Sequence, residues 1–128
     1  MAKRLYAQQI NTVRSQVVNI DNGAGTTLDE ALFNVGPKGG QIVRVYALYN
    51  EAAGTVAAAN FKLGSAAGGA QYVAATAYTD SAAVGAVTSA TIVEDTIPAN
   101  GTVYLRHTGI ATTALGQAFI CVEWVSNG

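Results

Sequence analysis

Short apolar stretches that alternate at period two, each ended by turn-forming residues, recur along the chain and constrain its fold more than any other feature. The clearest is residues 41–50, in which Val43, Val45, Ala47 and Tyr49 share one face. No stretch of helical length shows the periodicity of an amphipathic helix. We expect strands over residues 12–20, 28–35, 41–50, 55–64, 71–79, 87–93, 102–108 and 117–125.

The stretch at residues 28–35 also fits a helical turn, because Leu28, Ala31 and Leu32 would lie on one side of a helix. Glycine and proline follow it directly at positions 36 and 37, which favours a short strand. The length of 128 residues suits one domain, and no internal repeat is visible. The sequence therefore predicts an all-β, single-domain, jelly-roll-like antiparallel β-sandwich of seven or eight short strands over residues 12–128, after a short N-terminal arm, residues 1–11.

The last expected strand, residues 117–125, is the most apolar of the chain and contains its only Cys and only Trp. Both of its faces are apolar: one carries Ala118, Ile120, Val122 and Trp124, and the other carries Phe119, Cys121 and Val125 beside Gln117 and Glu123. A strand of this kind belongs in the middle of a sandwich or beneath a subunit contact. We expect a structural core here rather than a site.

Charged residues make up only 12% of the chain, about half the usual share, while apolar residues make up 50%. Small, weakly polar side chains must therefore cover much of the surface, which suits a chain packed into an assembly better than an isolated monomer. The net charge of −1 favours neither nucleic acid nor a membrane as a partner, and we predict neither.

The N-terminal segment is locally basic, because Lys3, Arg4 and Arg14 all precede the first acid, Asp21. Such a segment is either an ordinary solubilising terminus or an arm that docks on an acidic neighbour. No apolar segment of the secretory type follows the basic residues, so we expect synthesis in the host cytoplasm without export.

No combination of residues points to catalysis, and we predict no enzymatic activity, no cofactor and no metal. The single histidine, His107, shares a strand face with Val103 and Leu105, which favours a hydrogen-bonded structural role. The acids occur as neighbours, Asp29 with Glu30 and Glu94 with Asp95, and neighbours on a strand point to opposite faces. The glycine-rich stretches lack the spacing of a phosphate-binding loop.

Tyrosine and arginine dominate protein interfaces, so outward-facing residues of these types are our candidate contacts. Tyr46 lies on the mixed face of its strand, and Tyr104 lies beside Arg106 on the face opposite Val103. The candidate interface residues are Lys3, Arg4, Tyr6, Arg14, Tyr46, Tyr104 and Arg106.

Residues 97–125, IPANGTVYLRHTGIATTALGQAFICVEWV, resemble small virion proteins of tailed bacteriophages, namely capsid decoration or cement proteins with a jelly-roll β-sandwich. In those proteins a Pro/Asn/Gly turn leads into a Val-x-Leu strand, and a Gly-rich connection leads into a final apolar strand. The resemblance implies a non-enzymatic protein of the virion that binds the major capsid protein on the outer capsid surface. It also implies a homo-oligomer, a trimer or else a dimer, that stabilises contacts between capsid subunits. It carries over no site residues.

Two other functions stay open. A receptor- or carbohydrate-binding β-module of a phage tail or fibre would display outward aromatic residues with polar partners. A jelly-roll enzyme of the cupin type would need a cluster of metal-binding His and Glu residues, which a single histidine makes improbable.

Overall fold

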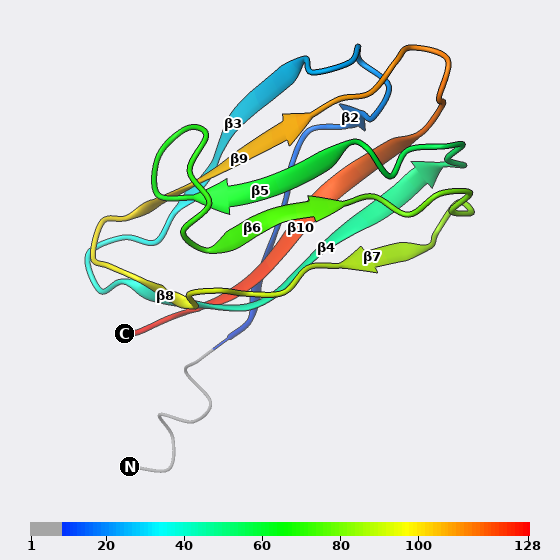
Figure 1. The fold of residues 1–128 in the computed structure, drawn as a ribbon. Helices are drawn as coiled ribbons and strands as arrows, with labels where there is room; N and C mark the ends of the chain where they lie inside the picture. The colour runs from blue at the N-terminus through cyan, green and yellow to red at the C-terminus, as the bar shows by residue number, and fades with distance from the viewer. Residues whose placement is uncertain (1–8) are drawn as a thin grey trace.

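The computed structural model describes residues 9–128, and its fold is a sandwich of two antiparallel β-sheets (Figure 1). The strands are β1 (Asn11–Arg14), β2 (Val18–Asn19), β3 (Thr27–Asn34), β4 (Gly40–Glu51), β5 (Asn60–Gly64), β6 (Val73–Ala77), β7 (Val87–Ser89), β8 (Thr96–Ile97), β9 (Thr102–Thr108) and β10 (Gln117–Ser126). The described residues contain no helix of the length and apolarity that a membrane crossing requires. Residues 1–8 of the expected arm lie outside the described part of the chain.

The strand order is that of a jelly roll. Sheet A runs β1-β10-β4-β7, with β2 also paired to β10 and β8 also paired to β4, and sheet B runs β3-β9-β5-β6. If β1 with β2, and β7 with β8, are each counted as one interrupted strand, the ten strands occupy eight positions. Their orders are then 1-8-3-6 and 2-7-4-5, the double Greek key of a jelly roll. The predicted all-β sandwich is confirmed.

The core lies between the two sheets and is built by strict alternation along the central strands. In β9, Val103, Leu105 and His107 are fully buried, while the residues between them are partly exposed. On β10, Ala118 and Ile120 are fully buried against them from the other sheet. The predicted inward orientation of His107 is therefore confirmed.

Strand β10 lies in the middle of sheet A, in agreement with the first of the two positions expected from its apolar faces. It pairs with β1 on one side and with β4 on the other, and ten of its residues take part in the β4 ladder. At its C-terminal end the Trp124 ring stacks on Phe33 of β3, with centroids 5.0 Å apart. Because β3 belongs to sheet B, this pair joins the two sheets at one end of the sandwich.

A β-bulge corrects the predicted face of Val43. The sequence placed Val43 inward with Val45, but its side chain is 46% exposed and Ile42 is buried instead. Trp124 pairs with Ile42 while its neighbour Glu123 pairs with Arg44, so Val43 is the extra residue of the bulge. An extra residue reverses the alternation, which a period-two pattern cannot anticipate.

The expected strand at residues 12–20 is interrupted. Strand β1 ends at Arg14. Ser15 still donates its backbone N–H to the carbonyl oxygen of Ile120, and its Oγ accepts a hydrogen bond from the Ile120 N–H, both at 2.9 Å. Gln16 is exposed, whereas Val18 and Ile20 are buried. Elsewhere, the strands expected at 55–64, 71–79 and 87–93 are shorter in the structure, and β8 was not predicted.

Candidate interaction surfaces

The outer face of sheet A carries two arginines laid over two aromatic rings. Arg14 of β1 and Tyr46 of β4 both pair with Cys121 of β10, so they lie in one row across the sheet. Phe119 and Glu123 lie on the same face of β10, two residues to either side. We call the set of Arg14, Arg44, Tyr46, Phe119 and Glu123 the arginine–aromatic face.

The geometry of this face shows direct contact between guanidinium groups and rings. The Cζ atom of Arg14 lies 4.6 Å from the centroid of the Phe119 ring, and that of Arg44 lies 4.3 Å from the centroid of the Tyr46 ring. Arg44 also reaches Glu123, with Nη1 and Oε2 3.8 Å apart. The rings are thereby held in place while the half-exposed Arg44 side chain still faces solvent.

Cys121 lies beneath this face and is only 2% exposed. Burial raises the pKa of its thiol, and burial likewise raises the pKa of the Tyr46 phenol, which the neighbouring Cys121 raises further. Both groups are therefore neutral near pH 7. The thiol fills space under the face and is not poised as a nucleophile.

The outer face of sheet B is organised by a bidentate ion pair. Arg106 of β9 donates from Nε and Nη2 to the two carboxylate oxygens of Asp29 on β3, at 2.7 and 2.8 Å. The bond lowers the pKa of Asp29 and raises that of Arg106. Tyr104 lies two residues away on the same face, partly exposed. Arg106 is thus engaged within the molecule, which weakens it as an anchor for a partner.

The structure divides the predicted interface residues between opposite faces. It brings Arg14 and Tyr46 together on sheet A, but it places Tyr104 and Arg106 on the outer face of sheet B. Lys3, Arg4 and Tyr6 lie outside the described residues. The sequence analysis missed Arg44 and Phe119. Alternation placed Phe119 on the same strand face as Cys121 and Glu123, but its contact with Arg14 depends on β1 and β10 being neighbours.

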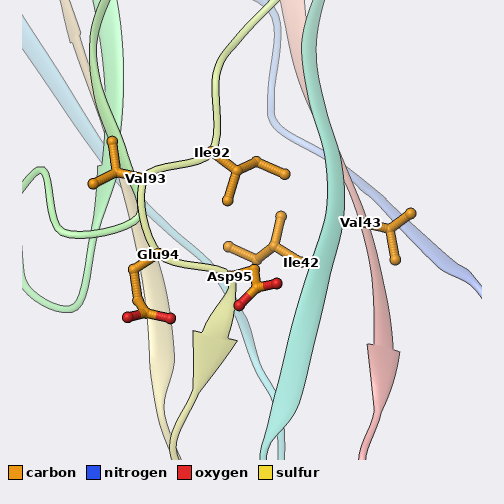
Figure 2. Close-up of a pocket in the computed structure, with 6 residues that line it drawn as sticks. All are labelled: Ile42, Val43, Ile92, Val93, Glu94 and Asp95. Atoms are coloured by element: carbon orange, nitrogen blue, oxygen red, sulfur yellow. The ribbon is translucent and has the colours of Figure 1, made fainter.

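A groove opens beside the start of β4. It has a volume of about 370 Å³ and is lined by Ile42, Val43, Ile92, Val93, Glu94 and Asp95 (Figure 2). Figure 2 shows Ile42 and Ile92 next to each other between β4 and the 92–95 segment, with Val43 on the opposite side of the β4 ribbon. We call it the acidic groove.

The groove exists because the chain leaves β4 between β7 and β8. Ala90 still donates its N–H to Val45, and Ile42 donates to Asp95, but Val93 donates to Tyr72 near β6 instead. The Asp95 carboxylate accepts a hydrogen bond from Gln41 Nε2 at 2.9 Å, and that of Glu94 accepts from the backbone N–H of Thr96 at 3.0 Å. Val93 itself remains 64% exposed.

The lone histidine is engaged in the core. The Tyr78 hydroxyl lies 2.8 Å from His107 Nδ1, and both side chains are buried. Burial lowers the pKa of His107 to about 4 although the backbone of Ile20 and Asn19 opposes the shift, so the ring is neutral near pH 7. Within residues 9–128, no group of three or more His, Cys, Asp or Glu side chains comes together as a metal site.

Comparison with known proteins gives one solved structure of similar fold. No protein-family model and no curated protein matches the chain. The chain is similar to a chain of a structure described as the cyanophage Pam1 capsid asymmetric unit, with 20% sequence identity and a TM-score of 0.57. The match covers 93% of this chain and 86% of the other. The likeness shows that the two chains share a fold.

Proposed function

We propose that this protein is a non-enzymatic structural protein of a phage virion, which binds the outer surface of the capsid as an oligomer and stabilises contacts between major capsid subunits. The arginine–aromatic face carries the proposal. Arginine and aromatic residues are enriched at the cores of protein interfaces, and here they gather on one sheet of a charge-poor molecule. The fold shared with a chain of a cyanophage capsid supports a virion role.

A rigid sandwich of this kind resists separation of the subunits that it bridges. Each contact needs only moderate strength, because repetition over a symmetric shell raises the effective concentration of every further contact. Tyr46 and Phe119 are the expected anchors. Their rings are already oriented by Arg44 and Arg14, so little side-chain freedom is lost on binding.

The test is cosedimentation of the purified protein with particles assembled from the major capsid protein encoded with it. Tyr46→Ala combined with Phe119→Ala should weaken binding by about 30-fold or more, as expected when anchors worth about 2 kcal/mol are removed. The matched control is Tyr104→Ala, which removes the same kind of ring from the outer face of sheet B. Equal binding by wild type and the double variant, both folded by circular dichroism, would refute the assignment of this face.

A carbohydrate-binding module is the second candidate from the sequence. One face of the Tyr46 ring is covered by Arg44, and Phe119 is covered by Arg14. Covered rings offer less area for stacking on a sugar, and this observation favours a protein partner. Specific binding on a glycan array, lost in Tyr46→Ala, would support the carbohydrate function instead.

A further inference from the structure

The acidic groove combines apolar walls with two adjacent carboxylates. Ile42 and Ile92 form its inner part, and Val93 stands exposed at its rim. Glu94 and Asp95 bond to backbone and amide groups, but neither is paired with a cation among residues 9–128. A segment with apolar side chains next to basic ones would match both properties.

The chain itself contains such a segment. Residues 1–8 include Lys3 and Arg4, followed directly by Leu5 and Tyr6. Because the whole chain carries −1 and Lys3 and Arg4 contribute +2, residues 9–128 carry −3. The basic segment and the body that bears the groove therefore attract each other.

The positions of the two features bear on whether the segment meets the groove of its own molecule or that of a neighbour. Asn11, at the start of β1, pairs with Trp124, and Trp124 pairs with Ile42. Strand β1 therefore begins level with the groove, but at the opposite edge of sheet A. To reach the groove of its own molecule, the segment would have to cross the outer faces of β10 and β4, where Glu123 and Arg44 project.

A head-to-tail neighbour avoids this crossing. If the β1 edge of one copy lies beside the β8 edge of the next, the five residues from Asn11 back to Tyr6 span about 16 Å when extended. That distance is about three strand spacings, enough to bridge adjacent edges. A contact between two different edges is heterologous, and repeated with a rotation it closes a ring.

We infer that residues 3–6 of one copy dock in the acidic groove of a second copy, with Lys3 and Arg4 on Glu94 and Asp95 and with Leu5 and Tyr6 on the apolar wall. The inference rests on the proposed oligomeric virion function and specifies how the copies are joined. It requires no contact with the capsid, so self-association and capsid binding can be measured separately.

Charge reversal tests the pairing by sedimentation velocity. Lys3→Glu with Arg4→Glu should weaken self-association about tenfold or more, and Glu94→Lys with Asp95→Lys should do the same, because each replaces attraction with repulsion. An equimolar mixture of the two variants should associate again. The control variant is Glu51→Lys, an exposed acid at the far end of β4, which should associate like wild type. A monomeric wild type, or a mixture that stays dissociated, would overturn the inference.

Disulfide trapping distinguishes a neighbour's groove from the chain's own. In a Cys121→Ala background, Tyr6→Cys with Val93→Cys should give a ladder of covalent oligomers under mild oxidation. A species that stays monomeric and migrates faster without reductant would place the segment in its own groove and refute docking between copies. Val84→Cys replaces Val93→Cys as the control, because Val84 is 66% exposed but lies outside the groove. If the dissociated variants still bind capsids, the contact between copies and the contact with the capsid are separate, and the proposed capsid binding stands.

Discussion

Acidification should destabilise the folded protein through the buried side chain of His107. His107 is fully buried, with Nδ1 2.8 Å from the Tyr78 hydroxyl. Burial raises the pKa of Tyr78 far above its usual value, so the phenol keeps its proton and donates it to Nδ1. Nε2 makes no well-formed hydrogen bond to any described residue. A second proton would place a charge on a fully buried ring, and the nearby backbone of Ile20 and Asn19 offsets only part of that cost.

The sign and size of the effect follow from the two pKa values. The pKa of His107 is about 4 in the folded protein, against 6.5 for the free side chain. Between these values the unfolded chain binds more protons, so stability is fully present above pH 6.5 and falls as the pH decreases toward 4. For one group of this kind the loss between pH 7.5 and pH 5 is about 2 kcal/mol.

Urea unfolding at these two pH values, at one protein concentration, measures the loss directly. The control is His107→Leu combined with Tyr78→Phe, which removes the titrating ring and the hydroxyl that would otherwise lose its partner. This variant should be equally stable at both pH values. The pKa of Asp29 is lowered by Arg106, so this carboxylate loses its stabilising contribution only at more acidic pH and does not confuse the comparison. An equal loss in the control, or none in wild type, would refute the role of His107.

Two further predictions concern a loop and the thiol. Asp80 Oδ1 accepts hydrogen bonds from the backbone N–H groups of Val56 and Ala57 at 2.7 and 2.8 Å, so Asp80→Ala should cost about 1–3 kcal/mol in guanidinium unfolding. Asp80→Asn keeps an acceptor and should cost less, and an equal cost for both would argue against these bonds. Cys121 is 2% exposed, so a maleimide should label it slowly in the native protein and fully in denaturant. Rapid native labelling would mean that β1 detaches from β10.

The central strands were predictable from sequence because local pattern determines them. Strand β9 was predicted to its exact bounds, since Val103, Leu105 and His107 alternate without interruption between a turn and a glycine. Strand β10 was predicted to within one residue at its end. The inward position of His107 followed from the same alternation.

The arrangement of the outer faces was not predictable, because it depends on pairing between distant residues. Arg14 and Phe119 meet only because β1 lies beside β10. The alternation within each strand does not specify which strands are neighbours. The bulge that exposes Val43 likewise arises from the pairing of β4 with β10. Predicting that Tyr46 and Tyr104 lie on opposite sheets would have required knowledge of the strand order.

The central position of β10 also determines when the protein can fold during synthesis. Strands β1 and β4 of sheet A do not pair with each other, so only β10, which pairs with both, joins them into one sheet. Its pairing with β1 joins residues at opposite ends of the chain, and contacts so far apart in sequence form slowly. Until the ribosome releases residues 117–126, the apolar edge of β4 is open to pairing with other nascent chains. Translation of the last strand is therefore the step that converts an aggregation-prone chain into a closed domain.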